Sequence, residues 1–242
     1  MEIEIVGLGY VGLPLALRLS NEFKVIGVDK DKSRIQMLSG GVDANEEYSS
    51  SDLKNKNLKF LLAEDAKDVK CNAYIVTVPT PIDDGNKPDL SLLCDATHYI
   101  AKKLKVGDIV SYESTVFPGA TNKICVPILE DVSGLTANVD FEVGYSPERV
   151  SPGKGGKRIH EITKVISSNT PNGLSLMKRI YSQVTEEGLF EAKNVEVAEF
   201  SKVLENTQRD LNIALVNEVS HICNRLGIKS NGPQNKTSRN YM

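Results

Sequence analysis

The sequence Glu2-Ile-Glu-Ile-Val-Gly-Leu-Gly-Tyr-Val-Gly-Leu-Pro-Leu-Ala-Leu-Arg-Leu19, with Lys24-Val-Ile-Gly-Val-Asp29 after it, decides the fold. Residues 2–6 form a short β-type run that ends directly at Gly7. Residues 13–19 have the composition of a buried helix, and a second β-type run, 24–28, ends at Asp29. This order of strand, glycine turn, helix, strand and acid predicts one βαβ unit of about 30 residues.

The same alternation continues along the chain. Apolar, β-branched runs predict strands over 73–78, 108–112 and 140–145, and the spacing of apolar residues predicts helices over 31–38 and 90–104. Strands that alternate with helices are typical of parallel sheets covered on both faces. We therefore expect an α/β fold with a Rossmann-type, doubly wound, mostly parallel sheet, followed by a long central helix.

The sequence changes character near residue 196. From there an apolar stripe runs at helical spacing, and it comprises Val197, Phe200, Leu204, Leu211, Leu215, Val219, Ile222 and Leu226. We expect a cofactor-binding domain over 1–195, the start of a helical dimerisation domain over 196–227, and a polar, disordered tail over 228–242. A stripe of that length predicts a homodimer formed through the 196–226 helix.

Composition excludes several classes of protein. The 242 residues include 29 basic and 32 acidic side chains, a net charge of -3, which argues against binding to nucleic acid or to a membrane surface. No apolar run approaches the roughly 20 residues of a membrane helix. A strand over 2–6 leaves no room for a secretory signal before it, and the four cysteines and three histidines lack metal-binding spacing. We expect a cytoplasmic protein without a metal.

Gly7-Leu-Gly-Tyr-Val-Gly12 fits the G-x-G-x-x-G pattern of dinucleotide-binding turns. In that pattern Gly7 permits the tight turn, Gly9 lets a pyrophosphate approach the backbone, and Gly12 lets the helix pack on the strand. Tyr10 and Val11 complete the turn. The phosphates would lie at the positive end of the helix.

The acid that closes the second strand indicates which cofactor binds. The Asp29 carboxylate is expected to accept hydrogen bonds from ribose hydroxyls and to repel the additional phosphate of NADP, which favours NAD. Lys30 and Arg34 follow it, and a basic group could instead pair with a phosphate. We expect Lys30 to be solvated and Arg34 to contact the cofactor.

Five blocks of the chain, in order, resemble the nucleotide-sugar 6-dehydrogenases, and the similarity extends from residue 1 to about 228. The blocks are 7–14, Val78-Pro-Thr-Pro81, Glu113-Ser-Thr-Val-Phe-Pro-Gly119, Ser146-Pro-Glu-Arg-Val150 and 202–218. The residues of these blocks are most similar to those of enzymes that oxidise UDP-N-acetylhexosamines to uronic acids for surface polysaccharides. UDP-glucose and GDP-mannose dehydrogenases look like more distant relatives.

The resemblance implies oxidation of the sugar C6 alcohol to a carboxylate by two hydride transfers to two NAD. It implies that Glu148 is the acid/base group for thioester hydrolysis. Thr115 would lie near the nicotinamide and the attacking water, and Thr80 would contact the cofactor. Lys202 would stabilise the developing oxyanion and Asn206 would orient the C6 group. Arg149, Val150 and Arg209 match positions that contact substrate.

Each of these residues also has an ordinary structural explanation. Lys202, Asn206 and Arg209 share one face of a helix by spacing alone, and such a face is often simply solvated. Glu148 could pair with Arg149, and Thr115 could cap a helix. Pro79-Thr80-Pro81 could be no more than a rigid turn.

The family's nucleophilic cysteine lies in a Gly-Gly-His-Cys segment that this sequence lacks, as it lacks the second α/β domain that grips the nucleotide. We expect a truncated chain whose four-electron reaction fails alone, unless a separate chain supplies these parts. Cys223, within the apolar helix, is expected to be a buried hydrophobe rather than a substitute nucleophile. Two alternatives stay open: an inactive, dimerising NAD-binding remnant, and a β-hydroxyacid dehydrogenase, which also carries a Lys-x-x-x-Asn pair.

Overall fold

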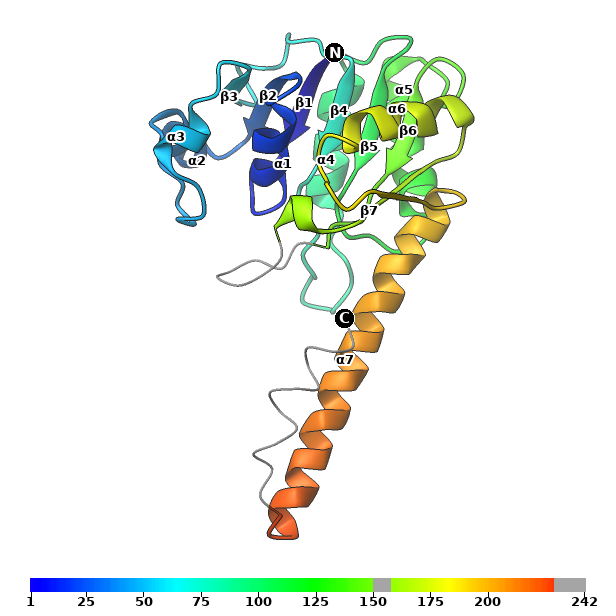
Figure 1. Cartoon of the computed structure of the whole chain (residues 1–242). Helices are drawn as coiled ribbons and strands as arrows, with labels where there is room; N and C mark the ends of the chain where they lie inside the picture. Colours follow the sequence, from blue (N-terminus) through cyan, green and yellow to red (C-terminus); the bar gives the residue numbers. More distant parts are fainter. Residues whose placement is uncertain (150–157, 229–242) are drawn as a thin grey trace. The chain divides into compact units, whose positions relative to one another are not determined.

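The computed structural model describes residues 1–149 and 158–228. Within them, one eight-stranded sheet has the order β3-β2-β1-β4-β5-β6-β7-β8 (Figure 1). The strands are β1 Glu2–Val6, β2 Lys24–Asp29, β3 Leu58–Leu62, β4 Ala73–Val76, β5 Ile109–Tyr112, β6 Glu142–Tyr145, β7 Lys164–Ser168 and β8 Leu189–Glu191. Strands β1 to β6 are parallel, whereas β7 runs antiparallel to β6. The predicted doubly wound, mostly parallel sheet is confirmed.

Helices cover both faces of this sheet. They are α1 Gly12–Leu19, α2 Lys32–Ser39, α3 Ser50–Leu53, α4 Ser91–Ala101, α5 Val126–Ser133, α6 Pro171–Tyr181 and α7 Val195–Arg225, with a π-helical turn at Thr121–Cys125 and a 3-10 turn at Ile159–Glu161. One apolar cluster joins α1, α2 and α6 to one face, and a second joins α4, α5 and the start of α7 to the other (Figure 1).

Local sequence explains where several helices begin and end. The Asp31 side chain caps α2 by accepting from two backbone N–H groups, and Thr170 caps α6 immediately before a proline. Gly134, with a φ of 71°, ends α5 in the left-handed conformation that glycine favours. Of these, the cap at Asp31 fixes the start of α2 just after the carboxyl end of β2.

The strands predicted from apolar runs are present, although the one expected over 73–78 ends at Val76. The sequence pattern did not predict β3, β7, β8 or α6. Strand β8 has only three residues, and β7 starts with a lysine and ends in two serines. A lysine interrupts the apolar residues of β3, so none of the three shows the continuous apolar run of a buried strand.

The long helix predicted over 196–226 is confirmed as α7. The chain divides into two compact units, Met1–Phe200 and Ser201–Met242, so that α7 begins in the first and continues in the second. Apart from Ile228, the tail expected to be disordered lies outside the described residues. No helix in the described part of the chain is long and apolar enough to cross a bilayer.

Candidate active site

An open cavity of about 690 Å³ lies along the carboxyl ends of β1, β2, β4 and β5. Ligands of open α/β sheets bind in this place, because the loops that leave the strands diverge there. Eight residues predicted from sequence as site residues line it: Gly7, Gly9, Tyr10, Val11, Asp29, Thr80, Thr115 and Glu148. The first unit therefore brings the glycine turn and the carboxylate of Glu148 to one cavity.

The glycine turn has a different requirement at each position. A Cβ on Gly12 would lie 1.9 Å from the carbonyl oxygen of Gly7, so only glycine lets α1 start this close to β1. A Cβ on Gly9 would meet nothing within 4 Å. The turn thus leaves open space at Gly9, where a phosphate could approach the backbone.

The start of α1 suits an anion. No side chain caps this helix end, and no acidic residue lies in its first turn. The N–H groups of a first helical turn have no partner within the helix and carry a partial positive charge. A pyrophosphate would supply the missing acceptors.

Asp29, at the end of β2, stabilises the glycine turn by hydrogen bonds and also lines the cavity. One of its carboxylate oxygens accepts from the N–H of Leu8 at 2.8 Å, and the other accepts from the N–H of Asp31 at 2.9 Å. Each carboxylate oxygen can accept more than one hydrogen bond. Asp29 can therefore hold ribose hydroxyls while it keeps the turn in place.

Arg34 lies behind the turn. Its Nε donates to the carbonyl of Leu8 at 3.0 Å, and its Nη1 pairs with Asp43 at 2.9 Å. Its Nη2 is buried and has no hydrogen-bond partner among the described residues. Arg34 supports the turn, but it is not among the residues that line the cavity, so the cofactor contact expected from the sequence stays a prediction.

Hydrogen bonds tie together the loops that follow β4 and β5. The hydroxyl of Thr80 donates to the carbonyl of Thr115 at 2.5 Å, and Ser114 donates to the carbonyl of Val78 at 2.6 Å. Thr115 is itself exposed. Its side chain is therefore accessible from the cavity, on a backbone that Thr80 and Ser114 hold in place.

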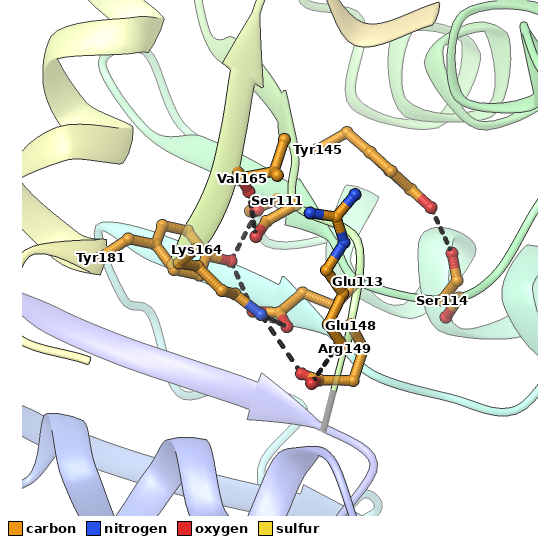
Figure 2. A network of polar contacts seen from close by, with 10 residues as sticks. Ser111, Glu113, Ser114, Tyr145, Glu148, Arg149, Lys164, Val165 and Tyr181 are labelled. Carbon is orange, nitrogen blue, oxygen red and sulfur yellow. Dashed lines mark hydrogen bonds and ion pairs between the residues drawn. The ribbon is translucent and has the colours of Figure 1, made fainter. Parts of the chain in front are cut away.

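A buried polar network closes one wall of the cavity (Figure 2). Nζ of Lys164 lies 2.6 Å from Glu113 and 3.2 Å from Glu148. Tyr181 donates to the other oxygen of Glu113 at 2.7 Å, and Ser111 lies 3.0 Å from the Tyr181 hydroxyl. Each carboxylate that faces the cavity here is held by a buried cation.

Burial and charge compete within this network. Burial raises the pKa of Glu113 above its usual range, although Lys164 opposes that effect. Burial alone would lower the pKa of Lys164, but Glu113 and Glu148 together hold it above its usual value. The lysine is therefore an ammonium at neutral pH.

Three predicted site residues lie on α7 in the second unit, which is described separately. Arg209 Nη2 donates to Asn206 Oδ1 at 2.5 Å, and its Nη1 lies 3.9 Å from Glu205. Lys202 is half-buried on the same helix. In the first unit, the backbone N–H of Arg149 donates to Glu148 at 2.6 Å, and Val150 lies outside the described residues.

Sequence reasoning missed Glu113, Lys164 and Tyr181 as members of the site. Glu113 stands in the quoted 113–119 block, but no role was inferred for it. The available signal for Lys164 was a charge at the start of the apolar pair Val165-Ile166. Nothing in the sequence shows that Tyr181, at the end of α6, reaches Glu113.

Comparison with known proteins identifies the family. Residues 1–185 match the NAD binding domain of the UDP-glucose/GDP-mannose dehydrogenase family, and residues 196–232 match its central domain. The chain is 49% identical over 230 residues to a UDP-N-acetyl-D-glucosamine 6-dehydrogenase of Pseudomonas aeruginosa, covering 94% of this chain and 54% of that protein. It is 34% identical over 234 residues to a UDP-N-acetyl-D-mannosamine dehydrogenase of Pyrococcus horikoshii, covering 94% and 55%.

Solved structures are similar as well. The structure of the UDP-D-ManNAc dehydrogenase from Pyrococcus horikoshii aligns with a TM-score of 0.86 at 34% identity, covering 94% of this chain and 55% of that one. A UDP-N-acetyl-mannosamine dehydrogenase from Staphylococcus aureus aligns with a TM-score of 0.82 at 31% identity, covering 93% and 55%. The chain spans about half the length of the relatives it matches. With its NAD-binding domain matched over 1–185, it belongs to the UDP-glucose/GDP-mannose dehydrogenase family.

Proposed function

We propose that this chain is the NAD-binding part of a UDP-N-acetylhexosamine 6-dehydrogenase. The observation that carries the proposal is that one cavity joins an uncapped glycine turn and Asp29 to the Glu113–Lys164–Glu148 network. A dinucleotide held on the turn would extend toward the carboxylates. NAD supplies the hydride acceptor, and the chain supplies groups that bind, orient and move protons.

The proposed cofactor contacts follow from the open space at Gly9, the N–H groups at the start of α1 and the carboxylate of Asp29. Tyr10, Val11, Thr80 and Thr115 line the same cavity. Arg34, which donates to the carbonyl of Leu8 within the turn, is proposed as a further contact. A carboxylate at position 29 disfavours the extra phosphate of NADP by charge repulsion.

The proposed roles in catalysis keep those that the resemblance implies. Glu148 accepts a proton at the cavity wall, and Thr115 orients water beside the cofactor. On α7, Lys202 stabilises negative charge on the substrate oxygen and Asn206 orients the C6 group. Arg149, Val150 and Arg209 are the proposed substrate contacts.

The substrate class is supported by the two relatives, which are named as dehydrogenases of UDP-N-acetylglucosamine and UDP-N-acetylmannosamine. We also propose a homodimer formed through α7, because Leu204, Leu211, Leu215 and Ile222 are each more than half exposed. The proposal includes the cytoplasmic location expected from composition. A β-hydroxyacid dehydrogenase is not proposed, since the matched family oxidises nucleotide sugars.

The test follows the absorbance of NADH when the purified chain is given NAD and either UDP-N-acetylglucosamine or UDP-N-acetylgalactosamine. The same sample is titrated with NAD. We expect NAD to bind and expect no formation of two NADH per sugar, because the sequence lacks the family's cysteine segment. Full turnover would show a nucleophile elsewhere in the chain, with Cys223 the first to replace. A folded sample that does not bind NAD would contradict the proposal.

An inactive, dimerising NAD-binding protein remains the second candidate, and the exposed apolar residues of α7 favour it. This candidate predicts that the chain binds NAD and forms a dimer. It also predicts no turnover when the cysteine segment and second α/β domain of a relative are added as a separate protein. Recovery of turnover in that mixture would exclude it.

A further inference from the structure

Two carboxylates reach the cavity wall from neighbouring strands. Glu113 follows β5 and Glu148 follows β6, and both line the cavity. Their common partner is Lys164, the first residue of β7 (Figure 2). The reversed direction of β7 explains how a strand start comes to this edge of the sheet, where the parallel strands end.

The register of β6 and β7 accounts for the contact. Tyr145 pairs with Ser167, and the hydroxyl of Ser146 donates to the carbonyl of Val165. Since the two strands are antiparallel, the chain after Tyr145 runs alongside the residues before Ser167. This places Glu148 beside Lys164, and the strands themselves therefore fix the distance between carboxylate and ammonium.

We propose that Lys164 is a positioning residue that holds the Glu148 carboxylate at the cavity wall as an anion, while Glu113 competes for the same ammonium. The inference rests on the proposed function, in which Glu148 must be ionised to accept a proton. Lys164 need not touch substrate or cofactor. It acts through Glu148.

Burial makes a nearby cation important for an ionised carboxylate. Glu113, Glu148 and Lys164 are 2%, 6% and 4% exposed. A carboxyl group buried to this extent favours its neutral form unless a positive charge lies nearby, and a neutral acid cannot act as a base. Lys164 carries its charge at neutral pH because the two carboxylates keep its pKa high.

Two neutral groups also donate to the carboxylates of this network. Tyr181 of α6 donates to Glu113, and the backbone N–H of Arg149 donates to Glu148. Both stabilise a carboxylate, but neither the phenol nor the backbone N–H carries a positive charge. When Glu113 is ionised it carries a negative charge, so its effect on Glu148 is opposite to that of Lys164.

These opposite effects give a test that does not require turnover. Glutamate carboxyl carbons of the 242-residue chain are labelled with carbon-13, and the NMR signal of Glu148 is assigned by its loss in Glu148→Gln. Its titration is then compared between wild type, Lys164→Met, Lys164→Arg and Glu113→Gln. Lys103→Met serves as the matched control, because Lys103 is also buried and paired with a glutamate, Glu4, outside this network.

We expect Lys164→Met to raise the pKa of Glu148 by about one to three units, because an adjacent positive charge is lost. Glu113→Gln is expected to lower it, because a negative charge is lost while the ammonium remains. Lys164→Arg should stay close to wild type, and Lys103→Met should leave the titration of Glu148 unchanged even if it destabilises the fold.

An unchanged Glu148 titration in Lys164→Met and Glu113→Gln would overturn the proposal. So would shifts in the same direction in both, since that is the behaviour of general destabilisation. If Lys164→Met does not fold, the proposal is judged from the direction in which Glu113→Gln shifts the pKa of Glu148. Lys164→Arg then serves as the conservative variant of the lysine. NAD binding and sugar oxidation do not enter the measurement, so a failure of the proposed function is distinguished from a failure of this inference.

Discussion

The Glu199 carboxylate, in the first turns of α7, accepts a hydrogen bond from the backbone N–H of Gly119 at 2.5 Å. Its second oxygen accepts from the N–H of Thr121 at 2.9 Å. Glu199 is fully buried, and Gly119 ends the loop that carries Thr115. The start of the long helix is therefore fixed to the loop that lines the cavity.

Glu199→Gln should destabilise the chain by about 1.5–3 kcal/mol, because the amide nitrogen cannot accept the N–H that the carboxylate oxygen accepted. Urea unfolding of the two proteins measures the difference. The matched control is Glu196→Gln, an exposed acid in the same part of the helix, which should change stability by less than about 0.5 kcal/mol. Equal stability of both variants would refute this role of Glu199.

The two glycines of the turn should respond differently to alanine. Gly12→Ala should lose stability and NAD binding together, because the new Cβ would lie 1.9 Å from the Gly7 carbonyl oxygen. Gly9→Ala should retain its stability to within about 0.5 kcal/mol and lose NAD affinity, because its methyl group fills the space proposed for the phosphates. Thermal unfolding with and without NAD separates the two effects. Unchanged NAD affinity in Gly9→Ala would place the pyrophosphate elsewhere.

The Glu4–Lys103 pair should stabilise the fold only as a pair. Both side chains are buried, with Nζ 2.7 Å from each carboxylate oxygen, and burial lowers the pKa of Lys103 and raises that of Glu4. Lys103→Met should cost about 3–5 kcal/mol by leaving a buried, uncompensated carboxylate. The double variant Lys103→Met/Glu4→Met should regain much of the lost free energy of unfolding, measured by urea unfolding. This explanation would be contradicted if the double variant lost as much stability as the two single variants lose together.

The cysteines should differ in their reactivity toward alkylating reagents. Burial raises the pKa of both Cys71 and Cys125 to about 12, so almost no thiolate forms at neutral pH. Cys223, which the sequence predicted to be buried, is only partly buried. Cys94 is also partly buried, but burial raises the pKa of its thiol. Iodoacetamide should therefore modify Cys223 first in the folded chain, and Cys71 and Cys125 only after unfolding. Peptide mass spectrometry reads the order, and early modification of either buried cysteine would contradict it.

The sequence predicted strands β1, β2, β4, β5 and β6, and it placed the glycine turn and Asp29 directly after or at the end of a strand. The glycine turn and Asp29 are local features, separated by about one βαβ unit, and local spacing determines their geometry. Lys202, Asn206 and Arg209 were predicted to share a helix face, and the contact between Arg209 and Asn206 agrees with that spacing.

The wall of the cavity that carries Glu113 and Glu148 was harder to predict. The Lys164–Glu148 contact depends on the antiparallel direction of β7, and no local pattern encodes the direction of a strand relative to its neighbours. The contact of Tyr181 with Glu113 joins α6 to β5 across 68 residues. Such contacts follow from packing of the whole unit, so the sequence pointed to Glu148 but not to the side chains that contact it.

The central claim is that the cavity binds NAD, and isothermal titration of the purified chain with NAD and with NADP tests it most directly. We predict saturable binding of NAD, and binding of NADP weaker by about tenfold or more because of the charge on Asp29. Asp29→Ala should reduce the difference between the affinities for NAD and NADP. A folded chain that binds neither cofactor, or that binds both equally well, would contradict the account.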